Sequence, residues 1–214
     1  MQTYKHLDNA PQYQMENSMQ AQIERSSPLL SATAKQVLLL IDWENFFYSL
    51  HSFWGPDKMR IEKNIERIMR WVANEIGELF GSHGLAFAPE HLSFFHQQIC
   101  VRNGLKLMIC PKRQLMTPKM NPKTGDMETE EDTVDETIIW FARAMLRHPN
   151  FKFVCLVAGD NDYVPLFMEL ERHGVKRALV VPTRDSLSKT KELVELVDKH
   201  PITLKKMSLR LDKA

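Results

Sequence analysis

Hydrophobic residues along the chain fall into two alternating kinds of segment. Short runs that are continuously apolar, or that alternate with polar residues, predict strands; apolar residues at helical spacing predict helices. The predicted strands cover residues 37–42, 85–88, 105–110, 151–157 and 176–181. Helical segments follow them, and such repeated units favour an α/β fold: a doubly wound parallel sheet flanked by helices on both faces.

The predicted helices begin and end at local signals. A helix over 60–80 stops at Gly81, and Pro89 opens a second helix that Gly104 ends. Thr133 and Glu136 fit a capping box at the start of a third helix. That helix covers 133–147, and two more are predicted over 162–173 and 186–199.

Three segments lie outside this alternation. Residues 1–35 are rich in Gln, Asn, Ser and Met and lack sustained periodicity, which predicts a flexible N-terminal arm that could mediate self-association or contact a protein partner. The folded domain is predicted over 36–203 and a basic tail over 204–214. Residues 111–131 predict a long loop, which Met116 and Met120 could anchor on the core.

The composition narrows the class of protein. The 214 residues are 43% hydrophobic and 26% charged, as in ordinary globular proteins, and the net charge of +1 means that any nucleic-acid binding must come from local patches. The three cysteines lack CxxC spacing, which favours reduced, buried thiols. No apolar run is long enough to cross a bilayer and no secretory pattern is present, so the expected location is cytoplasmic, without membrane association.

Acidic residues gather at the predicted carboxyl edge of the sheet. Asp42 ends the first strand, and Asp160 and Asp162 follow the fourth. In a doubly wound sheet, such positions meet in a crevice where the strand order reverses. At about 100° per residue, Asp135 points toward the sheet from the start of its helix. Clustered carboxylates repel one another, and a hard divalent cation such as Mg²⁺ or Mn²⁺ relieves that repulsion.

Each of these polar residues also has a purely structural interpretation. Asp160 or Asn161 could cap the following helix, and Asp162 suits a first helical turn. Asn45 could likewise cap the helix that follows the first strand. Asp42, by contrast, has no obvious capping role.

Three motifs resemble the NYN family of PIN-like nucleases. They are LLIDWEN (39–45), TVDETI (133–138) and VAGDNDYVPLFMELERHG (157–174), and the similarity extends from about residue 37 to 202. The resemblance implies a five-stranded parallel sheet of order 3-2-1-4-5 and metal-dependent ribonuclease activity. It further implies metal-site roles for Asp42, Asp135, Asp160 and Asp162, a supporting polar role for Asn45, and a place for Ser186 near the site.

The chain departs from the family pattern at two places. Asp132 and Thr133 stand where members often carry a glycine and a basic residue, and Phe141 and Ala142 stand where a second acid is common. The alternative to a ribonuclease is therefore a catalytically inactive RNA-binding or regulatory module with the same fold.

Contacts to RNA phosphates would come from cations at the same edge of the sheet. The candidates are Lys112, Arg113, Lys119, Lys123, Arg184 and Lys189, together with Ser186. Taken singly, each cation also fits ordinary solvated surface charge. Trp43 and Phe46 could stack on a base or fill the core.

Other classes of α/β protein that depend on an aspartate or a glycine-rich turn at the sheet edge match this sequence less well. A haloacid-dehalogenase-like phosphatase needs Asp-x-Asp after the first strand, whereas Asp42 is followed by Trp43 and Glu44. A response-regulator receiver needs an aspartate after the third strand, where Cys110 and Pro111 stand. A Rossmann dehydrogenase needs a glycine-rich turn after the first strand, which this sequence lacks.

Overall fold

The structure is a computed structural model that describes residues 36–54, 58–91, 94–120, 125–148, 151–198 and 202–203. The predictions for the N-terminal arm, the C-terminal tail and Lys123 lie outside the described residues. In the part of the chain that is described, no helix is long and apolar enough to span a membrane. All three cysteines are buried and free, as predicted.

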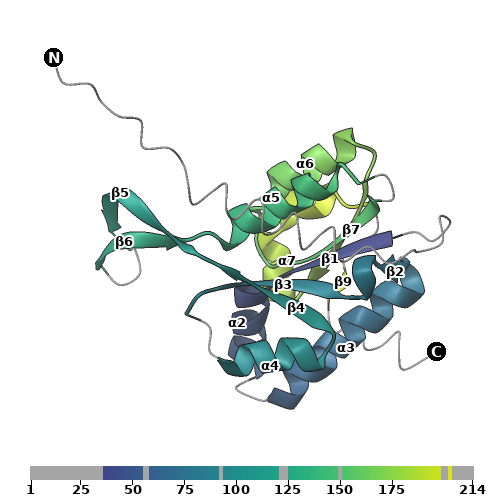
Figure 1. The fold of residues 1–214 in the computed structure, drawn as a ribbon, viewed down its shortest axis with the longest axis horizontal. Helices are drawn as coiled ribbons and strands as arrows, with labels where there is room; N and C mark the ends of the chain where they lie inside the picture. Colours follow the sequence, from purple (N-terminus) through teal and green to yellow (C-terminus); the bar gives the residue numbers. More distant parts are fainter. Residues whose placement is uncertain are drawn as a thin grey trace. The chain divides into compact units, whose positions relative to one another are not determined.

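A parallel sheet forms the centre of the fold (Figure 1). Its main strands are β1 (Gln36–Asp42), β3 (Gly84–Pro89), β4 (Leu105–Cys110), β7 (Phe151–Val157) and β8 (Lys176–Val181). They lie in the order β4-β3-β1-β7-β8, which confirms the predicted order 3-2-1-4-5. Two short strands were not predicted: β2 (Glu78–Leu79) pairs with β1, and β9 (Ile202–Thr203) pairs with β8, which makes seven strands rather than five.

Helices cover both faces of this sheet (Figure 1). They are α2 (Trp43–Trp54), α3 (Lys58–Glu75), α4 (Phe94–Arg102), α5 (Val134–Met145), α6 (Val164–Arg172), α7 (Arg184–Lys189) and α8 (Lys191–Glu195), with a short 3₁₀ helix, η1 (Phe80–Ser82). Alternate residues of each strand point to opposite faces. Accordingly, Leu39 and Ile41 of β1 pack in one core with α2 and α3, while Phe87 of β3 meets Phe141 of α5 on the other face.

The end of α3 and the start of α4 differ from the predicted boundaries. Helix α3 ends at Glu75 rather than near Gly81, because the N–H groups of Ile76 and Gly77 both donate to the carbonyl of Val72. Pro89 closes β3 instead of opening a helix, and α4 begins only at Phe94.

The last predicted helix is divided into α7 and α8 at Thr190. The Thr190 hydroxyl donates to the carbonyl of Ser186 at 3.1 Å, and its backbone leaves the helical region at φ −105°, ψ 25°. A threonine side chain that bonds to its own preceding turn competes with regular helix geometry.

The predicted loop at 111–131 is wrong: this segment forms an antiparallel hairpin of β5 (Lys112–Met120) and β6 (Met127–Asp132). The hairpin projects from the edge of the sheet (Figure 1). Its strands pair basic with acidic residues, such as Lys112 with Asp132 and Lys119 with Glu128, and such pairs stabilise a ladder. Nearly all of its side chains are exposed, so hydrophobic periodicity gave no strand signal. Met116 and Met120 are exposed and do not anchor it on the core.

Arg177 links three elements near the amino end of β8. Its side chain is 7% exposed and donates to Asp198 at 2.9 Å, to the carbonyl of Phe167 at 3.1 Å and to Glu171 at 3.2 Å. These bonds join β8 to α6 and to the segment after α8. Strand β8 and helix α6 flank the turn that carries Asp160, so Arg177 helps to hold the scaffold of that turn.

We expect Arg177→Met to lower the free energy of unfolding by about 2–4 kcal/mol, because it leaves the buried carbonyl of Phe167 and the partly buried carboxylate of Asp198 without their donor. Arg143→Met is the matched control, since Arg143 makes an exposed ion pair with Glu169, and it should cost no more than about 1 kcal/mol. Urea denaturation of both variants measures the difference. Equal stabilities for the two variants would contradict the role assigned to Arg177.

Candidate active site

Three of the four predicted acids, Asp42, Asp135 and Asp160, meet in one cavity of about 670 Å³ at the carboxyl edge of the sheet, which we call the acidic cavity. Its walls come from α2, the junction of β6 with α5, the turn after β7, and α7. It is lined by Asp42, Glu44, Asn45, Tyr48, Ser49, Ser52, Asp132, Val134, Asp135, Asp160, Thr183, Asp185, Ser186 and Lys189. Asp162 is not part of this lining.

Asp42 occupies the deepest position among these acids. It is the last residue of β1 and is only 4% exposed. Its Oδ1 accepts a hydrogen bond from the N–H of Asn45 at 3.0 Å, which satisfies a free donor at the start of α2. The expectation that Asp42 has no capping role is therefore wrong, and the expectation that Asn45 caps this helix is wrong as well.

Tyr163 forms hydrogen-bond contacts with both Asp42 and Asp135 through its hydroxyl group. Its side chain is fully buried, and its hydroxyl lies 3.0 Å from Oδ2 of Asp42 and 2.6 Å from Oδ1 of Asp135. A hydroxyl carries one proton, so it donates to one carboxylate at a time. The second contact is favourable when that carboxyl group itself holds a proton. No role for Tyr163 was predicted, because the sequence shows only a tyrosine at the start of an amphipathic run.

Asp160 is held by α2 and by its own turn. Its Oδ2 accepts from Nδ2 of Asn45 at 2.7 Å, and its Oδ1 accepts from the N–H of Asp162 at 3.3 Å. The residue that caps α6 is Tyr163, without a side-chain bond, so neither Asp160 nor Asn161 caps that helix through its side chain. Asn161 instead accepts from the N–H of Leu193 at 3.3 Å, which ties the turn to α8.

A close approach of the backbone accompanies this arrangement. A Cβ atom on Gly159 would lie 2.5 Å from Oδ1 of Asn45 and 3.0 Å from Oγ of Ser186. Only glycine fits here without displacing the side chain that orients Asp160. Oδ1 of Asn45 is buried and has no hydrogen-bond partner among the described residues.

Burial and mutual repulsion raise the pKa values of the clustered acids. Burial raises the pKa of Asp42 to about 7, against the opposing bond from Asn45, and the charge of Asp135 adds to the rise. Burial likewise raises the pKa of Asp160 to about 6, with repulsion from Asp135 and Asp162. The pKa of Asp135 is raised by burial and by the neighbouring Asp162, while the Tyr163 hydroxyl opposes the shift. Asp162 thus adds charge to the cluster without lining the cavity.

The acidic side chains are chemically suitable ligands for a divalent cation, but among the described residues they do not lie close enough together to bind one. Carboxylate oxygens with raised pKa values are the ligands expected for Mg²⁺ or Mn²⁺. Among the described residues, however, no three acidic, histidine or cysteine side chains converge closely enough to share one ion. Both oxygens of Asp42 and of Asp160 accept protein hydrogen bonds, so a cation would share these oxygens with their present donors.

The cations predicted to bind RNA separate into two groups. Lys189 and Ser186 line the acidic cavity, and Arg184 lies exposed at the start of the same helix. Lys112, Arg113 and Lys119 lie on the hairpin, where they form ion pairs. Lys189 is the one basic residue among the described residues that line the cavity.

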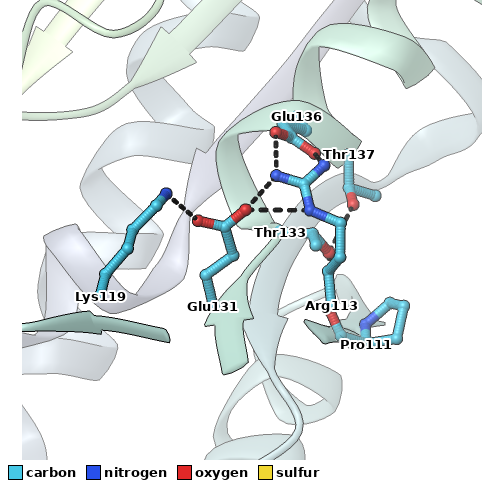
Figure 2. Close-up of polar contacts among 7 residues, drawn as sticks. All are labelled: Pro111, Arg113, Lys119, Glu131, Thr133, Glu136 and Thr137. Carbon is cyan, nitrogen blue, oxygen red and sulfur yellow. Dashed lines mark hydrogen bonds and ion pairs between the residues drawn. The ribbon is translucent and has the colours of Figure 1, made fainter. Parts of the chain in front are cut away.

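The base of the hairpin is fastened to the helix that carries Asp135 (Figure 2). Arg113 binds Glu131 of its partner strand and Glu136 of α5, the latter at 2.8 Å, and Lys119 binds Glu131 at 3.1 Å. The Thr133 hydroxyl donates to the carbonyl of Pro111 at 2.7 Å.

These contacts rule out the predicted capping box, because Thr133 makes no side-chain cap and Glu136 turns to Arg113 (Figure 2). The strand ladder places Asp132 opposite Lys112 at the rim of the cavity. The hairpin therefore fixes the first turn of α5, and with it the backbone of Asp135.

Trp43 and Phe46 belong to the core, because both side chains are completely buried. The indole N–H of Trp43 donates to Nδ1 of His96 at 3.0 Å. Neither ring is open to a nucleobase, so the stacking interpretation of these two residues is wrong.

Comparison with known families agrees with this geometry. The model of the NYN domain family matches residues 36–205, which is most of the chain. The chain therefore belongs to the NYN domain family, whose members have a PIN-like nuclease fold and are generally nucleases. No curated protein matches the chain closely enough to add a more specific function.

The raised pKa of Asp42 predicts a pH-dependent cost to stability when divalent cations are chelated. Between the ordinary value of 3.8 and about 7, the folded state binds a proton that the unfolded state has lost. The free energy of unfolding therefore falls as pH rises through that window. Below the window, the cost of the buried charge is absent.

We expect Asp42→Asn to raise the free energy of unfolding at pH 8 by about 2–4 kcal/mol, and to make little difference near pH 4. Asparagine keeps the acceptor for the N–H of Asn45 and removes the buried charge. Denaturant unfolding across pH, with chelator, measures the effect beside Asp126→Asn, an exposed acid on the hairpin. A variant that is less stable than the wild type at pH 8 would show that burial of this charge is not costly.

Proposed function

We propose that this protein is a ribonuclease that hydrolyses RNA phosphodiester bonds in the acidic cavity, with Mg²⁺ or Mn²⁺ as its cofactor. The observation that carries the proposal is the convergence of Asp42, Asp135 and Asp160 from three separate elements on one solvent-accessible cavity. A structural role alone does not account for three carboxyl groups whose pKa values are all raised by burial and by neighbouring acids. Membership of a family of nucleases supplies the reaction class.

In the proposed reaction, a water oxygen forms a bond to phosphorus while the bond to the 3′ oxygen breaks. Asp160, with a pKa of about 6, is mostly ionised at neutral pH and accepts the proton of that water. The leaving 3′ oxygen takes up a proton from solvent, so the products carry 5′-phosphate and 3′-hydroxyl ends. Asn45 positions Asp160 for this role, and Lys189 offsets part of the negative charge of the phosphate.

The bound cation would neutralise charge on the scissile phosphate and lower the pKa of a bound water. Asp42, Asp135 and Asp160 are the residues that we assign to hold it, and Asp162 supports them by its charge. This assignment rests on the chemistry of the donors. Burial raises the pKa values of Asp42 and Asp160, so protons compete with the cation and we expect its affinity to depend on pH.

A second candidate is an RNA-binding module without catalysis. The hydroxyl bridge from Tyr163 to Asp42 and Asp135 favours it, because that bridge stabilises the acids without an ion. RNA is the proposed partner in both cases. The free, buried thiols fit a reducing compartment, so we place either function in the cytoplasm. We further propose that residues 1–35 mediate self-association or a protein contact.

The test is incubation of the full chain with single-stranded and structured RNA in Mn²⁺, in Mg²⁺ or in chelator. We expect cation-dependent cleavage, and a loss on the order of 100-fold or more in Asp160→Asn, which removes a group acting at the reacting phosphate. Asp126→Asn, an exposed acid outside the cavity, should cleave like the wild type.

Three results would contradict this assignment. Cleavage that persists in chelator, or that survives Asp160→Asn, would place the activity elsewhere. RNA binding without cleavage under every condition would favour the non-catalytic module.

A further inference from the structure

One face of helix α2 forms a wall of the acidic cavity that carries Glu44 in its first turn and is uncharged beyond it. Asn45, Tyr48, Ser49 and Ser52 all line the cavity, and their spacing of three and four residues puts them on the same side of the helix. The wall begins beside Asp42 and Asp160 and extends for seven residues, which corresponds to about 10 Å along the helix axis. This wall is longer than a site made of the acids alone would need.

Tyr48 is the one aromatic residue among the described residues that line the cavity, and it is 48% exposed. Phe47 supports it from the side, with ring centroids 5.6 Å apart and an interplanar angle of 77°. Phe47 is itself stacked on the buried Trp43 at 6.5 Å and contacts His96 at 4.2 Å. The exposed phenol is therefore held in place by aromatic groups that reach into the core.

The composition of this wall differs from that of the rest of the cavity. The floor and the hairpin side carry Asp42, Asp132, Asp135 and Asp160, which repel a phosphate. Beyond Glu44 in its first turn, the α2 wall offers an aromatic ring and two hydroxyl groups, which suit the uncharged parts of a nucleotide. Nucleobases stack on aromatic side chains whatever their identity, and ribose hydroxyls exchange hydrogen bonds with serine.

We propose that the α2 wall is a nucleotide subsite next to the scissile phosphate, in which Tyr48 stacks on an unpaired base and Ser49 and Ser52 contact the ribose. This inference rests on the proposed function and adds the class of substrate to it. A base within a duplex is stacked between its neighbours and cannot lie against Tyr48. The preferred substrate is accordingly a single-stranded segment, read without strong base preference.

The experiment measures coupling between Tyr48 and individual bases. A short single-stranded oligoribonucleotide is made as a series with one abasic position moved along it, and its affinity is measured for the full chain with Mn²⁺ in an Asp160→Asn background. We expect one position at which loss of the base weakens binding on the order of tenfold. In the added variant Tyr48→Ala, affinity for the intact oligonucleotide falls by a similar factor, and the abasic change at that position has no further effect.

Companion variants separate stacking from structure. Tyr48→Phe keeps a stacking ring and should retain the affinity, whereas Tyr48→Leu keeps the bulk and should lose it; Tyr48→Leu also serves if the alanine variant fails to fold. Met168→Ala, an exposed residue of α6 outside the cavity, should behave like the parent protein.

Failure of the subsite and failure of the proposed function give different results. If the oligonucleotide binds but the Tyr48 variants bind equally well, or every abasic position is additive with Tyr48→Ala, the subsite is overturned and the ribonuclease proposal stands. If the Asp160→Asn parent and the wild type both fail to bind or cleave the oligonucleotide, both proposals are overturned.

Discussion

The shared hydroxyl of Tyr163 is the interaction on which the candidate site depends. Asp42 arrives from β1 and Asp135 from α5, and one buried phenol lies between them. Without such a donor, two partly buried carboxylates would repel each other across a low-dielectric space. The hydroxyl allows both acids to stay inside the fold, because its hydrogen bonds oppose the rise in their pKa values that burial causes.

The elements around this pair are arranged to present it to solvent. Asn45 connects α2 to Asp160, and Gly159 lets the backbone pass close to that amide. On the opposite side, the ion pair of Arg113 with Glu136 fastens the hairpin to the turn that carries Asp135. The clustered acids lower the stability of the fold, and the surrounding contacts offset this cost. A reactive site and its scaffold are commonly related in this way.

The sequence allowed the sheet and most of the acids to be predicted, because both depend on local periodicity. The apolar runs of β1 and β7 are covered on both faces, and helical phase places Asp135 toward the sheet. The contact made by Tyr163 could not be predicted, since it depends on distances between side chains more than a hundred positions apart in the chain. Capping by Asp42 was missed because the helix begins one residue after the strand ends.

The hairpin and the position of Tyr48 could not be predicted because their side chains are exposed. Cross-strand charge pairs leave no hydrophobic pattern, and a half-exposed tyrosine on a helix looks like any surface residue until the cavity beside it is known. The ring contact between Phe47 and Tyr48 appears in the sequence only as a run of neighbouring aromatic residues.

The central claim is that the buried acids form one linked site that exchanges protons for a divalent cation. Calorimetric titration of the full chain with Mn²⁺ near pH 6.5, in two buffers of different ionisation heat, counts the protons that leave when the ion binds. The account predicts saturable binding with net proton release, since Asp42 and Asp160 have pKa values of about 7 and 6. Saturable binding without proton release, or no binding at all, would contradict it.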